Sequence, residues 1–197
     1  MANDRLMVRK FEDARADHRK RYEFAAERLK GLRVLDIACG CGYGSWFLHQ
    51  AGNEVTGVDI DPEAIAWAKE HFSGEKEDSP GPTFIQADAQ KFHSRIYDAL
   101  VTFETLEHLD YPQVLLDNWV SKVIASVPNQ EGYPFKAHRF EGDKYPHKRH
   151  YKPQEFEELL TKAGFKVKEK FCQKDKLGEI SEGTDGMFLI YVATKGA

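Results

Sequence analysis

The sequence predicts an α/β fold in which parallel strands alternate with helices. Short apolar runs rich in β-branched residues alternate with longer segments of helix formers. Glycine or Asp-Pro marks many of the boundaries between them, and no internal repeat or low-complexity tract interrupts the alternation. The length of 197 residues is about that of one domain. We therefore expect one compact unit, with an N-terminal helical segment (residues 1–30) and a main domain (residues 31–197).

The first part of the chain predicts a strand, turn and helix unit that is followed by a second strand and helix. An apolar stripe at positions i, i+3, i+4 and i+7 supports the first helix. Asp61 and Pro62 are typical of an N-cap and a first helical residue. The expected elements are a helix over 12–30, a strand over 33–38, a helix over 43–52, a strand over 54–60 and a helix over 63–72.

The second part predicts three more strands, a short helix, a clear helix and two closing strands. The EGTDG cluster between the closing strands indicates an antiparallel pair. The expected elements are strands over 83–88, 97–104 and 122–129, a short helix within 109–120, a helix over 153–164, and strands over 165–171 and 187–195. The segment 130–152 has no periodicity, and a loop of this length inside a compact domain is usually functional.

Composition excludes several classes of protein. The formal charge of −4, from 28 Lys and Arg against 32 Asp and Glu, does not fit a dedicated polyanion binder. The mean hydropathy is −0.59, no apolar run approaches the length of a membrane span, and the start MANDRLMVRK has no apolar signal region. Three cysteines make a poor disulfide framework. We expect a soluble, cytoplasmic protein that does not act at a membrane.

The segment DIACGCGYG (36–44) joins a predicted strand to a predicted helix. Its glycines allow a tight turn and a close approach to a nucleotide-like ligand. Asp36 distinguishes between two kinds of ligand, because a carboxylate repels the pyrophosphate of a dinucleotide and attracts the ammonium and sulfonium of S-adenosylmethionine. Asp59, at the end of the next strand, is suited to the ribose hydroxyls, and Asp88-Ala89 to the adenine edge.

Four segments in this order, VLDIACGCGYGS, GVDIDPEAIAWAKEH, IQADAQ and FETLEHL, resemble the motifs of class I S-adenosylmethionine-dependent methyltransferases. The resemblance implies a Rossmann-like, seven-stranded, mostly parallel sheet with helices on both faces and an antiparallel last strand. It also implies that the segment from His18 to Tyr22 covers the methionine end of the cofactor. The cofactor contacts that we expect are Tyr22, Asp36, Ala38, Gly40, Gly42, Asp59, Ile60, Asp88, Ala89 and Phe103. A P-G-G-type turn is missing before the fifth strand, which predicts shortened elements there.

A second group of polar residues follows the fourth strand. Glu104, Glu107 and His108 have i, i+3, i+4 spacing, which places them on one face of a helix. Residues 136–152 add six Lys or Arg, two acids and three histidines. In one interpretation His108, Glu104 and His150 are catalytic, with a histidine as general base and the basic loop holding an anionic or aromatic substrate.

Two other interpretations remain open. The E-x-x-E-H segment resembles that of metal-dependent RNA 2′-O-methyltransferases and a related quinone-pathway group, which implies a divalent site made by Glu104, Glu107, His108 and either His147 or His150. Alternatively, these residues only cap a short helix beneath a solvated loop. We expect that no metal is needed.

The function that the sequence favours is methyl transfer from S-adenosylmethionine to a small-molecule, sugar or nucleotide-type acceptor, at oxygen or nitrogen. The alternatives are a metal-dependent enzyme similar to RNA 2′-O-methyltransferases, and a non-catalytic domain that binds S-adenosylmethionine. An NAD-dependent oxidoreductase is disfavoured by Asp36.

Overall fold

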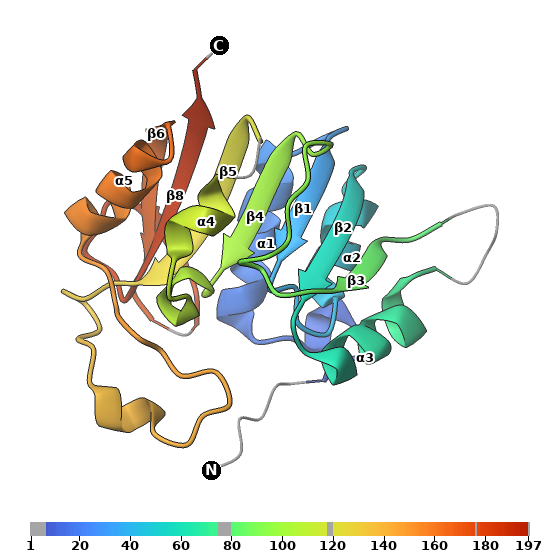
Figure 1. The fold of residues 1–197 in the computed structure, drawn as a ribbon, viewed down its shortest axis with the longest axis horizontal. Coiled ribbons are helices and arrows are strands. Elements are labelled where there is room, and N and C mark those ends of the chain that lie inside the picture. Colours follow the sequence, from blue (N-terminus) through green and yellow to red (C-terminus); the bar gives the residue numbers. More distant parts are fainter. Residues whose placement is uncertain (1–6, 75–79, 118–119, 176, 197) are drawn as a thin grey trace.

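A mixed sheet forms the centre of the protein (Figure 1). The computed structural model describes residues 7–74, 80–117, 120–175 and 177–196. Within these residues the sheet has eight strands in the order β3-β2-β1-β4-β5-β8-β6-β7. The parallel strands are β1 (Arg33–Ile37), β2 (Glu54–Asp59), β3 (Thr83–Gln86), β4 (Ala99–Phe103) and β5 (Lys122–Pro128). The antiparallel part is formed by β6 (Phe165–Gln173), β7 (Ile180–Glu182) and β8 (Phe188–Lys195).

Helices cover both faces of the sheet. One face carries α1 (Ala16–Arg28), α2 (Tyr43–Gln50) and α3 (Pro62–Phe72), and the other carries α4 (Pro112–Leu116) and α5 (Pro153–Lys162). Three 3₁₀ turns, η1 (Phe11–Asp13), η2 (Leu106–His108) and η3 (Ala137–Phe140), lie outside the regular helices. Asp61 caps α3 by accepting a hydrogen bond from the Glu63 amide, and Pro62 begins the helix, as predicted.

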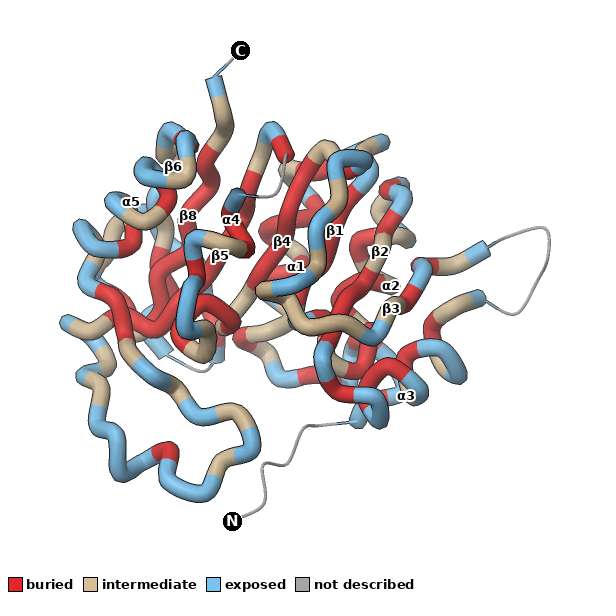
Figure 2. The backbone as a smooth tube through the Cα atoms, viewed as in Figure 1, coloured by how far each residue is buried: buried red, intermediate tan, exposed pale blue. Residues whose placement is uncertain are grey.

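Side chains along the parallel strands point alternately to the two faces of the sheet, so the hydrophobic core has two parts, one on each face. Val34 packs in the cluster that contains Leu48 of α2, and Leu35 packs in the cluster that contains Phe156 of α5. Figure 2 shows the strands largely buried between the helical layers. Among the described residues, no helix is long and apolar enough to cross a membrane.

The predicted fold class is confirmed, but the predicted number of seven strands is wrong. The additional strand, β7, has three residues and pairs only with β6, so it is too short to show an alternating pattern in the sequence. The first helix begins at Ala16 because a 3₁₀ turn occupies residues 11–13. α4 is short, as expected, but β5 keeps seven residues. Residues 75–79 of the predicted loop and residues 118–119 of the predicted helix segment lie outside the described residues.

The connection from β5 to α5 crosses the carboxyl ends of the parallel strands (Figure 1). We call residues 130–150 the flap. Much of it is exposed, as Figure 2 shows, but Phe140 and His150 are buried. The backbone holds the flap at its second end, where the Lys148 amide donates to the carbonyl of Glu107 at 2.8 Å.

Candidate active site

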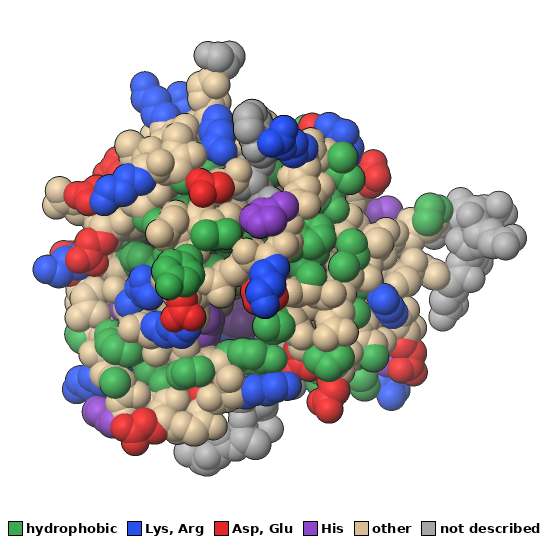
Figure 3. Space-filling model, in the orientation of Figure 1, with side chains coloured by type: hydrophobic (Ala, Val, Ile, Leu, Met, Phe, Trp, Pro, Cys, Tyr) green, Lys and Arg blue, Asp and Glu red, His purple; other side chains and the backbone are tan. Residues whose placement is uncertain are grey.

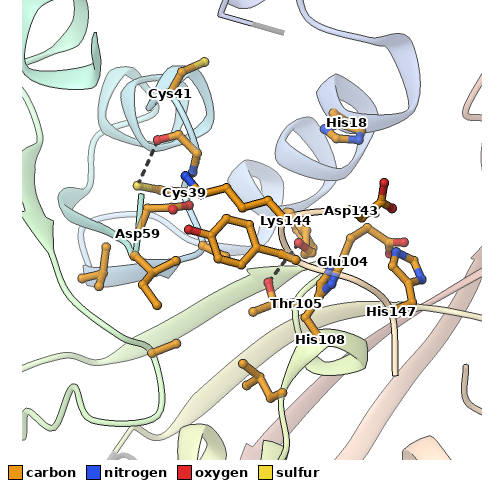
Figure 4. A pocket seen from close by; sticks show the side chains of 18 of the residues that line it. His18, Cys39, Cys41, Asp59, Glu104, Thr105, His108, Asp143, Lys144 and His147 are labelled. Carbon is orange, nitrogen blue, oxygen red and sulfur yellow. Dashed lines mark hydrogen bonds between the residues drawn. The ribbon is translucent and has the colours of Figure 1, made fainter. Parts of the chain in front are cut away.

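A cavity of about 710 Å³ lies at the carboxyl ends of β1, β2 and β4, beneath the flap. Parallel α/β sheets bind ligands at this edge, and small-molecule sites have volumes of about 300–1,000 Å³. Figure 3 shows histidine side chains in a hollow on this face, with hydrophobic and charged side chains around it. The close view in Figure 4 places Asp59 and Cys39 at one end of the cavity and His108 and His147 at the other.

The glycine turn forms the floor at the first end. Gly40 and Gly42 have positive φ angles of 56° and 89°. The Gly40 amide donates to Oδ2 of Asp59 at 2.9 Å, and the Asp61 amide donates to Oδ1 at 2.9 Å. These two backbone donors fix the Asp59 carboxylate at the cavity wall.

Asp36 lies beneath this floor and does not line the cavity. Its carboxylate is fully buried and accepts hydrogen bonds from the Ser45 hydroxyl at 2.6 Å and the Tyr22 hydroxyl at 3.2 Å. Burial raises the pKa of Asp36 to about 7, although both hydrogen bonds oppose the shift. The Tyr22 side chain does line the cavity. Asp36 is therefore in position to act on a ligand through Tyr22 and through its charge, not by direct contact.

Gly42, the other predicted cofactor contact that does not line the cavity, has a packing role. A Cβ atom at this position would lie 2.7 Å from the Cβ of Ala68, so only glycine fits against α3. The remaining predicted cofactor residues all line the cavity: Tyr22, Ala38, Gly40, Asp59, Ile60, Asp88, Ala89 and Phe103. Their roles in binding stay predictions.

Helix α1 brings Arg21, which lies within the predicted segment from His18 to Tyr22, to the cavity. Arg21 is almost completely buried, and its Nε donates to Oε1 of Gln173 in β6 at 2.6 Å. Its Nη1 lies 3.8 Å from Oε1 of Glu104, which also accepts a hydrogen bond from the Ser126 hydroxyl at 2.8 Å. Burial raises the pKa of Glu104, although Arg21 opposes the shift. Glu104 thus lines the cavity between a cation and a strand hydroxyl.

At the second end, Glu107 is fully buried, and neither of its carboxylate oxygens has a hydrogen-bond partner. Its Oε1 lies 3.9 Å from Nε2 of His108 and 4.0 Å from Nε2 of His147. Burial, together with the nearby Glu104, raises the pKa of Glu107 well above its ordinary value. The helical face predicted for Glu104, Glu107 and His108 is wrong, because residues 106–108 form a 3₁₀ turn and Glu104 has a positive φ of 51°.

Glu107, His108 and His147 form a set of side chains that fits a metal ion. One ligand atom from each of the three lies within 4.8 Å of the others. A buried carboxylate without partners and two imidazole nitrogens are donors that divalent transition metals accept. Glu104 is not part of this set.

The structure places the flap histidines differently from the prediction. His150 does not line the cavity, whereas His147 does. His150 lies behind His147, with its Nε2 3.0 Å from Nδ1 of His147. The sequence did not separate the two, because both precede α5 within a few residues and the choice depends on the path of the loop.

Three basic side chains of the flap already have partners of their own. Lys144 pairs with Asp61 at 3.1 Å, Lys148 pairs with Asp110, and Arg149 donates to the carbonyl of Leu109 at 3.2 Å. An anionic acceptor would compete with these partners, which weakens the hypothesis that the flap grips an anion.

The segment 35–124 matches the family model described as a methyltransferase domain. A ubiquinone biosynthesis O-methyltransferase of Aromatoleum aromaticum is 38% identical over 89 residues, which are 43% of this chain and 36% of that protein. The chain spans about a third to two fifths of the length of such curated relatives.

Solved structures of S-adenosylmethionine-dependent methyltransferases share the fold across most of the chain. One from Thermotoga maritima, described as a possible histamine N-methyltransferase, has a TM-score of 0.71 at 18% identity, covering 90% of this chain and 88% of its own. Magnesium protoporphyrin IX methyltransferase of Synechocystis, solved with S-adenosylmethionine bound, has a TM-score of 0.65 at 20% identity, covering 92% of this chain and 78% of its own.

Residues 35–124 therefore have the pattern of a methyltransferase domain, and most of the chain has the fold of solved S-adenosylmethionine-dependent methyltransferases. Both similarities agree with the predicted family and with the predicted cofactor, S-adenosylmethionine.

Proposed function

We propose that this chain transfers the methyl group of S-adenosylmethionine to a hydroxyl oxygen of a small molecule bound beneath the flap. One observation carries the proposal: a single cavity joins the glycine turn and Asp59 to the histidines of η2 and the flap. The similarity to proteins named O-methyltransferases supports oxygen as the methylated atom.

The first end of the cavity is suited to the cofactor. Asp59 offers carboxylate oxygens to the ribose hydroxyls, and Asp88 and Ala89 lie along the wall where the adenine would extend. Tyr22 and the acid beneath it offer a partly negative surface to the ammonium group. The cofactor's methyl group would then point toward Glu104 and the histidines.

The second end is suited to removing a proton from the acceptor. Burial and the neighbouring His108 lower the pKa of His147 to about 3, so the imidazole is neutral at pH 7 and able to accept a proton. A base this weak serves an acidic hydroxyl better than an aliphatic alcohol. A phenol, with an ordinary pKa of about 10, is therefore the acceptor class that we propose.

Metal-assisted transfer is a second candidate, favoured by the carboxylate of Glu107, which is buried without a hydrogen-bond partner. Glu107, His108 and His147 would hold the ion. When bound, a divalent cation lowers the pKa of a coordinated hydroxyl. In this case the two histidines would bind the ion and would not accept the proton themselves.

The test is a transfer assay with S-adenosylmethionine labelled in its methyl group. We expect catechol to become labelled and benzylamine and cyclohexanol to remain unlabelled. Labelling of benzylamine but not catechol would contradict oxygen transfer, and tight binding of S-adenosylhomocysteine without labelling of any acceptor would favour the non-catalytic alternative. A parallel assay with chelator distinguishes the two mechanisms, because only the metal-assisted one loses activity and regains it with added Mg²⁺ or Mn²⁺.

A further inference from the structure

A line of hydrogen bonds connects the flap backbone to His147. Nδ1 of His150 lies 2.6 Å from the carbonyl oxygen of Tyr133, and Nε2 of His150 lies 3.0 Å from Nδ1 of His147. All three residues belong to the flap, and only His147 continues to the catalytic end of the cavity, where its Nε2 faces Glu107.

A carbonyl oxygen only accepts hydrogen bonds, so Nδ1 of His150 must carry the hydrogen. At pH 7 the neutral ring is the ordinary form of a histidine side chain. In a neutral ring only one nitrogen is protonated, so Nε2 of His150 is an acceptor. Nδ1 of His147 must then be the donor, and Nε2 of His147 carries a lone pair.

Aromatic packing holds the His147 ring in the orientation that this lone pair requires. The ring stacks on Phe140, with centroids 4.1 Å apart and planes 8° apart. It meets the ring of His108 edge to face at 4.5 Å. The hydrogen bond to His150 fixes the tautomer of His147, and the stacking on Phe140 fixes the direction in which Nε2 of His147 points.

A carbonyl of the flap also fixes the tautomer of His108. Its Nδ1 lies 3.2 Å from the carbonyl oxygen of Pro146, which makes Nδ1 the donor in the neutral ring. Its Nε2 lies 3.9 Å from the same Glu107 oxygen. Two flap carbonyls, those of Tyr133 and Pro146, thereby direct two imidazole lone pairs toward the carboxyl group of Glu107.

We propose that His150 is a positioning residue that transmits the orientation of the Tyr133 carbonyl to His147 and fixes His147 in the tautomer with its proton on Nδ1. The inference rests on the proposed function, in which His147 receives the acceptor's proton or a metal ion at Nε2. It also assigns a task to the flap, because the carbonyls of Tyr133 and Pro146 accept the hydrogen bonds that set these tautomers.

The direct test is nuclear magnetic resonance of protein labelled with ¹⁵N in histidine, dialysed against chelator and saturated with S-adenosylhomocysteine at pH 7. The loss of signals in His147→Gln assigns the His147 ring. We expect Nδ1 of His147 to show the shift of a protonated nitrogen and Nε2 that of an unprotonated one. The opposite pattern in the wild-type protein overturns the proposal, and this experiment needs no acceptor, so it does not depend on whether methyl transfer is confirmed.

Two substitutions at position 150 show whether His150 sets the tautomer. His150→Leu removes the acceptor, and we expect a mixture of tautomers at His147 and about a tenfold loss of kcat with catechol, without a change in affinity for S-adenosylhomocysteine. His150→Gln keeps an amide acceptor and donor, and we expect it to retain the wild-type tautomer and most of kcat.

The matched control is His138→Leu at an exposed flap histidine, which we expect to change neither the tautomer nor kcat. If His150→Leu leaves the His147 signals unchanged, the proposal is wrong. If His150→Leu does not fold, the proposal is still tested by His150→Gln, which must keep the wild-type tautomer.

Discussion

The two ends of the cavity are built in different ways. We call the end with the glycine turn and Asp59 the cofactor end, and the end with His108 and His147 the acceptor end. At the cofactor end, backbone hydrogen bonds join the glycine turn to the sheet. The amides of Ala38 and Cys39 donate to the carbonyl of Val58 in β2, at 2.8 and 3.1 Å. At the acceptor end, the wall consists of a 3₁₀ turn and the flap, joined by the backbone hydrogen bond from Lys148 to Glu107 and by side-chain contacts such as the edge-to-face pair of His108 and His147.

This difference has a consequence for mutations. Backbone hydrogen bonds within a sheet are hard to disturb by changing one side chain. A substitution at the cofactor end should therefore remove the contacts of that side chain and leave the neighbouring backbone in place. At the acceptor end each side chain also orients its neighbour, so one change disturbs the whole group. We expect changes at the first end to weaken cofactor binding and changes at the second end to lower turnover.

The largest effect is expected at the acceptor end. His147→Ala removes the nitrogen that we propose accepts the proton or binds the metal ion, and we expect kcat with catechol to fall about 100-fold or more. Calorimetry should find the affinity for S-adenosylhomocysteine unchanged. His138→Ala, an exposed histidine of the same flap, serves as control and should keep wild-type turnover. Equal losses of turnover and cofactor affinity in His147→Ala would mean that the two ends are not separable.

The next effect belongs to the cofactor end. Asp59→Ala removes the carboxylate that we propose binds the ribose and that also accepts from the Gly40 and Asp61 amides, and we expect affinity for S-adenosylhomocysteine to fall about 10- to 100-fold. Asp98→Ala is the matched control, since Asp98 pairs with Arg33 before β4, far from the strand ends that line the cavity. Wild-type affinity in Asp59→Ala, measured by calorimetry, would remove Asp59 from the site.

A smaller effect concerns the proton on Asp36. Its pKa of about 7 means that roughly half of the free protein carries this proton at pH 7. The positive ammonium of the cofactor lowers the pKa of the carboxyl, so binding should release up to about half a proton and become tighter as the pH rises through about 7.

Calorimetry in buffers with different ionisation enthalpies measures this release. Asp36→Asn has no carboxyl to titrate and should abolish it, which separates Asp36 from every other titrating group. Release that persists in Asp36→Asn would place the proton elsewhere.

The smallest effect tests the link between the two ends. Lys144 of the flap extends across the cavity (Figure 4), and its Nζ lies 3.1 Å from a carboxylate oxygen of Asp61, at the start of α3. Because the Lys144 side of this ion pair is exposed, Lys144→Ala should speed dissociation of S-adenosylhomocysteine by less than about threefold, and high salt should reduce the difference. Stopped-flow measurement with Lys136→Ala, an exposed flap lysine, as control checks this. A loss of tenfold or more would mean that the flap controls cofactor retention.

The sequence by itself determined the order of elements from β1 to β5, the helix start at Asp61 and the similarity of residues 35–124 to a methyltransferase domain. These features depend on local patterns: apolar runs, caps and a glycine turn each act within about ten residues of chain. The cofactor end could be predicted for the same reason, since its residues directly follow strands whose carboxyl ends must meet at one edge.

Only the tertiary structure decided which carboxylate lies beneath the floor, which flap histidine reaches the cavity and which acid lacks a hydrogen-bond partner. Asp36 is covered by Tyr22 from α1, and His147 meets Glu107 across about forty residues of chain. Burial and side-chain direction at such positions depend on how distant segments pack, and a different path of the flap would bring a different histidine to the cavity. Residue type and spacing do not predict that packing, because the same side chain is charged or neutral, and buried or exposed, according to its neighbours in the folded protein.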